Sequence, residues 1–310
     1  TTGTGGTFNA AAGTFTPALG ATTSTFTYTV SGIAPCGSDS SAATVNIIAQ
    51  PDAGSNGATT VCETDTTAVD LYSLITGEQA GGTWVRSTGT GGTFNAAAGT
   101  YTPAVGATTS TFTYTITATA PCTNVSSVAT VNINPFPTAG VDGSTTVCET
   151  STTAINLSSL ITGEQSGGTW VQTTGTGGTF NAAAGTFTPA IGATTSTFTY
   201  TVNGLAPCGS DSSVATVNIL AQPDAGRNGS TTVCETSTTA IILSSLITGE
   251  QSGGTWVRST GTGGTFNAAA GTYTPAVGAT TSTFTYTITA TAPCANVSSV
   301  ATVIINAQPD

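Results

Sequence analysis

The sequence carries very little charge, and almost none of it is positive. Its 310 residues contain 14 Asp and Glu, three Lys and Arg and no histidine, for a formal net charge of −11. All three basic residues are arginines, so the chain has no amine for a Schiff base. Without histidine it also lacks the commonest general base and zinc ligand. Three arginines cannot supply the many phosphate contacts that nucleic-acid binding needs. We therefore expect no enzyme, no cofactor and no nucleic-acid partner.

Long apolar segments are missing too. The sequence has no run of 18 apolar residues, and no basic leader precedes an apolar segment. It therefore predicts neither a membrane span nor a signal peptide. We interpret the chain as an internal piece of a longer protein, with no membrane insertion of its own.

What the sequence does contain is a repeat of 86 residues. The segment TGTGGTFNAAAGT begins at residues 2, 88, 174 and 260, with no insertion or deletion between copies. A period this long is typical of a small domain, whereas solenoid units have 20 to 50 residues. The domains predicted from this period are residues 1–51 (the C-terminal part of a truncated repeat), 52–137, 138–223 and 224–309, with residue 310 opening the next junction.

Each repeat has the pattern of short β-strands. In the copy 52–137 we predict seven strands, at 58–64, 68–75, 82–87, 92–96, 99–103, 109–118 and 127–134. Residues 109–118 alternate threonine with Phe112, Tyr114 and Ile116, so one face is apolar and the other polar. The one helical candidate is a single turn at residues 71–75.

Seven strands with turn signals and a tryptophan on the third strand indicate an all-β fold, a tandem array of immunoglobulin-like β-sandwich domains. The tryptophans could instead be platforms for sugar stacking, but each lies beside a valine in mid-strand, which favours the core. The residues predicted in the core are Trp84, Trp170, Trp256, Phe112, Tyr114, Phe198, Tyr200, Phe284 and Tyr286.

Seven cysteines form two series with the same 86-residue spacing: Cys36, Cys122, Cys208 and Cys294, and Cys62, Cys148 and Cys234. Two pairings respect the repeat, one within a repeat and one across the junction, as Cys36 with Cys62. The junction pairing has to span a strand of roughly 30 Å, whereas disulfide-bonded Cα atoms lie within about 7 Å.

We therefore predict disulfides within repeats. The expected pairs are Cys62 with Cys122, Cys148 with Cys208, and Cys234 with Cys294, which leaves Cys36 to an upstream partner. Each would close a loop of about 60 residues and contribute roughly 4 kcal/mol in the chain-entropy model. Such bonds indicate an oxidising, extracytoplasmic compartment.

The carboxylates recur with the repeat, but none stands in an inserted loop that could build a catalytic cleft. Acidic residues near the Pro/Gly-rich junctions are candidates for calcium, which takes six to eight oxygen ligands. The alternative is a solvated turn. The calcium candidates are Asp52, Glu63, Asp142, Glu149, Asp224 and Glu235.

The motifs LITGEQ, GGTW and GTGGTFNAAAGT follow one another in fixed order. In this respect the chain resembles the repeat region of the SprB-type gliding-motility adhesins of Bacteroidetes. The resemblance implies a very long protein exported by type IX secretion, attached at the outer membrane and moved along the cell surface by a motor. It also implies outer-membrane motility and secretion machinery, and an external surface or polysaccharide, as partners.

We therefore expect a structural stalk or filament segment of a cell-surface adhesin, flanked by further repeats of the same chain. Parallel end strands would share shear load, disulfides would limit extension, and Pro-containing junctions would limit bending. Two alternatives remain open: a multivalent array of glycan-binding modules, which would act through avidity, and a non-motile extracellular filament.

Overall fold

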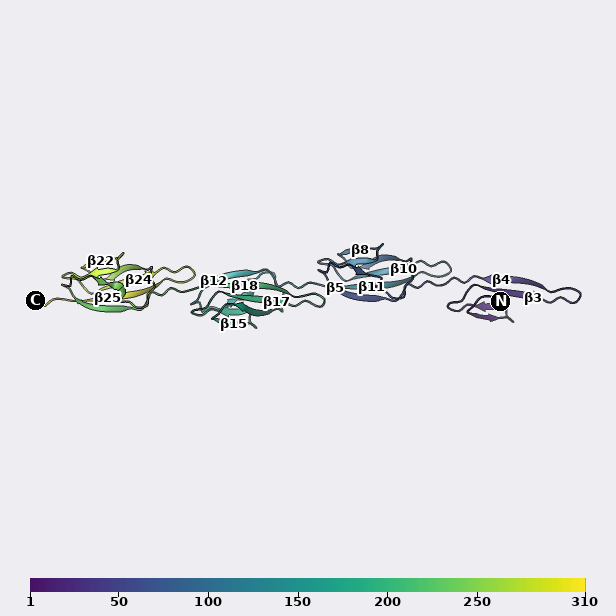
Figure 1. Ribbon diagram of the computed structural model, residues 1–310, viewed down its shortest axis with the longest axis horizontal. Helices are drawn as coiled ribbons and strands as arrows, with labels where there is room; N and C mark the ends of the chain where they lie inside the picture. The colour runs from purple at the N-terminus through teal and green to yellow at the C-terminus, as the bar shows by residue number, and fades with distance from the viewer. Residues whose placement is uncertain (310) are drawn as a thin grey trace. The chain divides into compact units, whose positions relative to one another are not determined.

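The computed structural model describes residues 1–309, and within them the regular structure is β-sheet with two short 3₁₀ turns (Figure 1). The chain divides into two compact units. The first is Thr1–Pro137 with Gly204–Ser210, and the second is Thr138–Asn203 with residues from 211 onward. None of the helical segments in residues 1–309 is long and apolar enough to cross a membrane.

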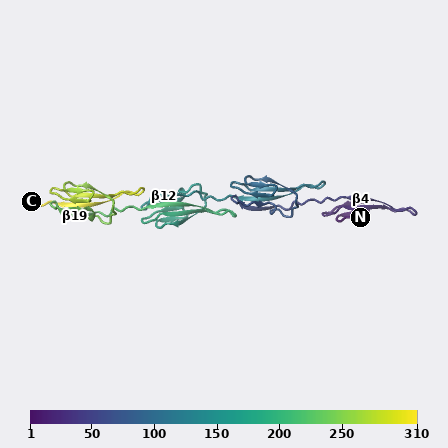
Figure 2. The ribbon, with the colours of Figure 1, turned by 45° about the horizontal axis from the view of Figure 1, so that its top comes forward.

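The repeat 52–137 folds into two sheets whose buried side chains share one core, and Figure 2 shows the same ribbon turned by 45°. One sheet has the strand order β5-β11-β10-β7 and the other β6-β9-β8. The strands are β5 Gly57–Cys62, β6 Val69–Asp70, β7 Thr83–Thr88, β8 Thr93–Asn95, β9 Thr100–Thr102, β10 Ser110–Ile116 and β11 Val125–Asn134. All seven predicted strands are present, although the stretch 68–75 forms a strand only at its start.

Alternation of side chains along β10 builds the core. Phe112 and Tyr114 have no exposed surface and face the other sheet, next to Trp84 of β7. The threonines between them lie on the opposite face, where Thr111 and Thr113 pair through their hydroxyls with side chains of β7. Threonine suits this face because its branched carbon favours the extended backbone while its hydroxyl stays bonded.

The first strand of the repeat pairs with the last. β5 runs parallel to β11, with Gly57 opposite Ala129 and Cys62 opposite Asn134, whereas β10 and β7 join the sheet antiparallel. This order, with a buried tryptophan on the third strand, is that of an immunoglobulin-like sandwich. The chain is thus a tandem array of immunoglobulin-like β-sandwiches.

The next two repeats have the same topology. Their strands are β12 Gly143–Cys148, β13 Ile155–Asn156, β14 Thr169–Thr174, β15 Thr179–Asn181, β16 Thr186–Thr188, β17 Ser196–Val202 and β18 Asp211–Leu220, then β19 Gly229–Cys234, β20 Ile241–Ile242, β21 Thr255–Thr260, β22 Thr265–Asn267, β23 Thr272–Thr274, β24 Ser282–Ile288 and β25 Val297–Asn306. The helical candidate at 71–75 corresponds in these repeats to the 3₁₀ turns η1 Leu157–Ser159 and η2 Leu243–Ser245.

Residues 1–51 form two hairpins, which contact each other through the rings of Phe8, Phe15 and Phe26. β1 Thr7–Asn9 pairs with β2 Thr14–Thr16, and β3 Ser24–Val30 pairs with β4 Asp39–Val45. The side chain of Tyr28 is 71% exposed here, while its equivalent Tyr114 in the complete repeat is fully buried. The residue type is the same, so the burial of this tyrosine depends on the strands of the complete sandwich.

Candidate functional site

Two disulfides connect neighbouring repeats, one at each of two junctions. Cys62 bonds to Cys208 and Cys148 bonds to Cys294, with Cα atoms 5.0 and 4.9 Å apart and a sequence separation of 146 residues in both cases. The first bond lies in the first compact unit and the second bond in the second unit. The repeats are therefore connected by sulfur as well as by the chain itself.

The prediction of disulfides within repeats, Cys62 with Cys122, Cys148 with Cys208 and Cys234 with Cys294, is wrong. Cys62 ends β5 opposite Asn134, the last residue of β11, while Cys122 precedes the first residue of β11. The two cysteines of one repeat are thus separated by a ten-residue strand, about 30 Å at 3.3 Å per residue. The parallel pairing of β5 with β11 causes this separation.

The loop that supplies the second cysteine docks on the preceding repeat. We call the segments between the last two strands, residues 31–38, 117–124, 203–210 and 289–296, the cysteine loops. The side-chain amide of Asn134 donates a hydrogen bond to the carbonyl of Ala206 at 2.8 Å, and that of Gln222 donates to Ala295 at 2.6 Å. These polar contacts hold each loop beside the cysteine that ends the first strand of the preceding repeat, so they position the sulfur atoms for bonding.

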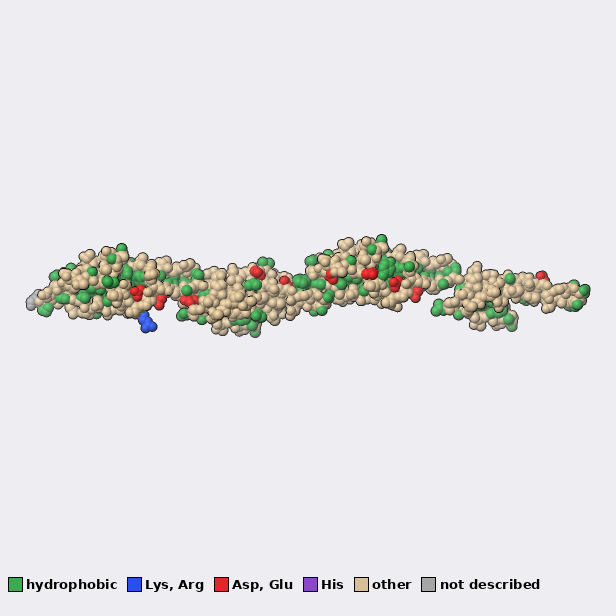
Figure 3. Space-filling view, in the orientation of Figure 1, with side chains coloured by type: hydrophobic (Ala, Val, Ile, Leu, Met, Phe, Trp, Pro, Cys, Tyr) green, Lys and Arg blue, Asp and Glu red, His purple; other side chains and the backbone are tan. Residues whose placement is uncertain are grey.

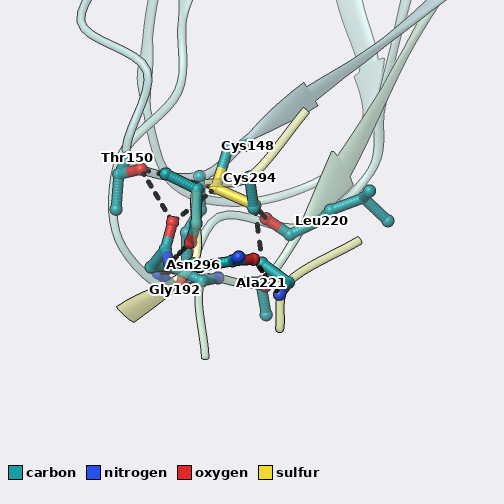
Figure 4. Close-up of a disulfide and its surroundings, with 11 residues drawn as sticks. Cys148, Thr150, Gly192, Leu220, Ala221, Cys294 and Asn296 are labelled. Carbon is teal, nitrogen blue, oxygen red and sulfur yellow. Dashed lines mark hydrogen bonds between the residues drawn. A yellow bond between two sulfur atoms is a disulfide. The ribbon is translucent and has the colours of Figure 1, made fainter. Parts of the chain in front are cut away.

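The other half of each junction is the end of the first strand. We call residues 62–64, 148–150 and 234–236 the acceptor ends. Figure 4 shows the acceptor end of Cys148, where the hydroxyl of Thr150 donates to the sulfur at 3.3 Å and the Cys294 sulfur lies 3.5 Å from the carbonyl oxygen of Leu220. The cysteine loop thus fits against the end of the last strand of the preceding repeat.

The glutamate after each first cysteine holds the linker to the next repeat. Glu149 is 9% exposed, and its carboxylate accepts hydrogen bonds from the N–H groups of Gly192 at 2.7 Å and Gln222 at 2.9 Å. Glu235 makes the same two bonds, to Gly278 and Gln308. The Gln308 and Gly278 N–H groups lower the pKa of Glu235 from its ordinary value of 4.5. These carboxylates therefore orient the chain where it leaves the sandwich.

The calcium candidates do not gather into one place. In residues 1–309 there is no group of three or more His, Cys, Asp or Glu side chains that could hold a metal ion. Glu63 accepts from the N–H groups of Gly106 and Phe136, and Asp142 accepts from Val214. Asp52 and Asp224 each accept from the glycine two residues later, as in a turn. The structure uses these carboxylates to bond backbone amides.

Cys36, Cys122 and Cys234 form no disulfide in residues 1–309. A partner at the observed separation of 146 residues would precede residue 1 for Cys36 and Cys122 and follow residue 310 for Cys234. Even so, the loop of Cys122 is docked. Its thiol donates to the carbonyl of Ile48 at 3.4 Å, and the Gln50 amide donates to the carbonyl of Thr123 at 2.7 Å. Docking therefore takes place without the covalent bond.

All nine aromatic residues expected in the core are buried, but the surroundings of the tryptophans differ between repeats. The Tyr72 ring packs edge-on against Trp84 at 5.5 Å. The equivalents of Tyr72 are Ser158 and Ser244, and beside them lie concavities of about 340 and 360 Å³ next to Trp170 and Trp256. Two repeats thus carry an open polar concavity where the other has a tyrosine ring.

Sequence analysis missed the polar residues that dock the loops. Gln50, Gln222 and Gln308 recur in the motif AQ, and the first two donate to a cysteine loop. The remaining equivalent position holds Phe136, and there Asn134 donates instead. The recurrence of glutamine just before the prolines was the available signal.

The chain matches no protein-family model and no curated protein. Solved structures match at low identity. An I-band fragment from titin has a TM-score of 0.44 and 10% identity, covering 81% of this chain and 96% of that chain. Drosophila N-cadherin has a TM-score of 0.32 and 9% identity, covering 81% and 74%. The insect immune protein hemolin has a TM-score of 0.32 and 12% identity, covering 92% and 82%.

Proposed function

We propose that this chain is a load-bearing stalk segment of a cell-surface adhesin, and that it connects an anchor mechanically to an adhesive region. The observation that carries the proposal is the pair of disulfides between successive repeats. An array that only displayed independent domains would have no use for sulfur bonds that cross from one domain to the next.

The two disulfides enclose overlapping segments, and the overlap shortens the covalent path under tension. From residue 1 the path runs to Cys62, crosses to Cys208, returns along the chain to Cys148 and crosses to Cys294. Most of the chain in the repeats is bypassed on this path. Unfolding of the repeats 52–137 and 224–309 therefore lengthens the molecule far less than their residue numbers would allow.

The hydrogen bonds between the first and last strands of the repeat also resist tension. Because β5 and β11 are parallel neighbours, the chain enters and leaves the repeat at opposite ends of the same strand pair. When the disulfide at Cys62 is open, pulling on the two ends loads these hydrogen bonds in shear, so all six residue pairs of the register must give way together. Each sandwich is thus built to resist stretching along β5 and β11.

The compartment and the surface agree with an extracellular role. Disulfides persist in oxidising environments. Charged side chains are sparse on the face seen in Figure 3, and the net charge is −11. An acidic surface with few cations is expected to avoid anionic cell surfaces.

We call the covalent route through both disulfides the load path. Single-molecule stretching from the two ends of the chain tests whether tension follows it. With both disulfides closed, the fully stretched length should be about 450 Å, and after reduction about 1,000 Å, at about 3.3 Å per residue. Equal lengths in both states would refute the load path.

Single-bond variants make the test sharper because the enclosed segments overlap. Replacing Cys62 and Cys208 by serine, or Cys148 and Cys294, should give about 540 Å in both cases at about 3.3 Å per residue. Loss of the first bond thus adds little length, and loss of the second adds most of it. A Cys122→Ser variant is the matched control, with no change in length.

We also propose that the adhesin is of the gliding-motility type that the motifs LITGEQ and GTGGTFNAAAGT indicate. In cells that produce this chain, a fluorescent antibody fragment against the repeats should label the surface of intact cells, and the label should travel along the moving cell. A label that stays fixed while cells move would leave a non-motile filament.

A multivalent glycan-binding array is the second candidate, favoured by the concavities beside Trp170 and Trp256. Tyr72 shows how the same place is filled in another repeat, so Ser158→Tyr with Ser244→Tyr should close both concavities without new backbone geometry. Glycan-array binding that the native chain shows and this variant lacks would support the second candidate. Absence of binding by the native chain would count against it.

A further inference from the structure

The three acceptor ends have the same local chemistry. The threonine two residues after each cysteine has its hydroxyl 3.2 to 3.4 Å from the sulfur. The glutamate between this cysteine and threonine accepts one hydrogen bond from a loop glycine and one from the linker in each case. Cys62 and Cys148 each bond to a cysteine loop. The third acceptor end, with Cys234, is therefore built like two sites that already hold a loop.

The third site is open. Cys234 is exposed and forms no disulfide in residues 1–309. Gln308 corresponds to Gln222, whose side-chain amide donates to the docked loop at Ala295. The Thr236 hydroxyl lowers the pKa of the Cys234 thiol, which favours the thiolate that attacks disulfides.

The cysteine loops are equally uniform. In all four, the N–H of the cysteine donates to the carbonyl three residues earlier, at 2.8 to 3.0 Å. The loop of Cys122 docks through Gln50 and Ile48 without any disulfide. The contacts that dock the loop thus form without a bond between the sulfurs.

We propose that the acceptor end of Cys234, with Gln308, binds the cysteine loop of another repeat of this kind and forms a disulfide with its cysteine. The proposal rests on the two closed junctions and stands whether or not the stalk function is correct. In this bond the two thiols give up two protons and two electrons to a disulfide oxidant such as oxidised glutathione, which becomes two thiols.

If the stalk function also holds, this bond changes the load path. The shortest covalent route through the last two repeats then runs from Cys208 to Cys234, through β18 and β19, which supply ten and six residues already in strands. Because strands are close to full extension, such a path can lengthen very little under tension.

Disulfide mapping on the full chain tests the proposal. The reduced chain is reoxidised in a mixture of oxidised and reduced glutathione, and linked peptides are identified by mass spectrometry. We expect links between chains that join Cys234 to the exposed Cys36 in excess over links of Cys234 to Cys234. Gln308→Ala should lower the yield of the Cys234 to Cys36 link about fivefold, as expected for one lost hydrogen bond. Symmetric Cys234 links in excess, unchanged by Gln308→Ala, would overturn the proposal.

A lengthened chain provides a second measurement, because the short first repeat could hinder docking between molecules. A second copy of residues 138–223 is placed after residue 309. We expect Cys234 to bond to the copy of Cys208, and Cys234→Ser to leave that cysteine free. A free Cys234 in the lengthened chain, with Cys62 and Cys148 bonded as before, would overturn the proposal.

Discussion

At the scale of residues, equivalent positions in the repeats differ in ways that reveal what each side chain does. Arg86 donates to the carbonyl of Gly91 and to the hydroxyl of Ser110, which has no exposed surface, and its guanidinium lies 5.2 Å from the ring centre of Tyr101. Gln172, at the same place in the next repeat, reaches the neighbouring carbonyls with its amide. Arg86 therefore serves the interior of its sandwich.

Filling the concavity beside Trp256 should stabilise its repeat. In the repeat that has Tyr72, this ring packs edge-on against Trp84 and Tyr114. Ser244→Tyr should therefore add about 0.5–1.5 kcal/mol to the free energy of unfolding, the range for aromatic pairs, and Tyr72→Ser should remove a similar amount from its own repeat. Urea unfolding followed by fluorescence, in chains that keep one tryptophan in the repeat under study, checks both. A destabilising Ser244→Tyr would show that the concavity cannot accept the ring.

Acid should weaken the repeat that contains Glu235. The folded-state pKa of this carboxylate is lowered by the N–H groups of Gln308 and Gly278, so its contribution is present above pH 4.5 and is lost as the pH falls through the folded pKa. Glu235→Gln should reduce stability at neutral pH, and the difference from the native chain should shrink on acidification. Unfolding curves from pH 7 to pH 3 measure this, with Glu250→Gln as the control. A difference that stays constant with pH would contradict the assignment.

At the scale of elements, the first strand of each repeat sets the geometry of the junction. It carries the acceptor cysteine to the end of the sandwich where the chain exits, because it lies parallel to the last strand. The glycine at the start of this strand packs closely against backbone. A Cβ atom on Gly143 would come within 1.7 Å of the carbonyl oxygen of Leu160, and Gly57 and Gly229 have the same contact with their equivalents.

Gly143→Ala should therefore displace β12 and lower the stability of its repeat by about 1–3 kcal/mol or more, as expected for overpacking against backbone. Gly209→Ala is the matched control in the same repeat, since a Cβ there meets nothing within 4 Å. Unfolding followed by Trp170 fluorescence, in a chain with the other two tryptophans replaced by phenylalanine, compares the two. Equal stability of the two variants would contradict the close packing of β12 at Gly143.

At the scale of the whole molecule, the disulfides change how the repeats unfold. Each bond closes a segment of 146 residues, which is worth about 5 kcal/mol in the chain-entropy model. Each enclosed segment also includes parts of more than one repeat, so the stabilisation is shared between neighbours. Without the bonds, a linear array behaves as nearest-neighbour units.

Calorimetry should detect this coupling. The native chain should unfold at higher temperature and in fewer resolved transitions than the chain with Cys62, Cys208, Cys148 and Cys294 replaced by serine. A variant that lacks only Cys122 should behave like the native chain, because this thiol forms no disulfide in residues 1–309. Identical transitions in all three chains would show that the sulfur bonds do not couple the repeats.

Local pattern was enough to predict the period of 86 residues, the seven strands of a repeat and the burial of Trp84 and Phe112. These properties follow from alternation of apolar and polar side chains, which neighbouring residues in a strand express directly. Both series of cysteines were likewise visible in their spacing.

The pairing of those cysteines arises only in the folded molecule. Sequence spacing does not report which strands become neighbours, and the parallel contact of β5 with β11 brings together segments more than 60 residues apart. That contact places Cys62 and Cys122 at opposite ends of one repeat and brings Cys62 to the loop of the next. The role of Glu149 has the same origin, because its partners Gly192 and Gln222 reach it through the fold. Strand alternation depends on local sequence, whereas disulfide pairing depends on where strand ends meet in space.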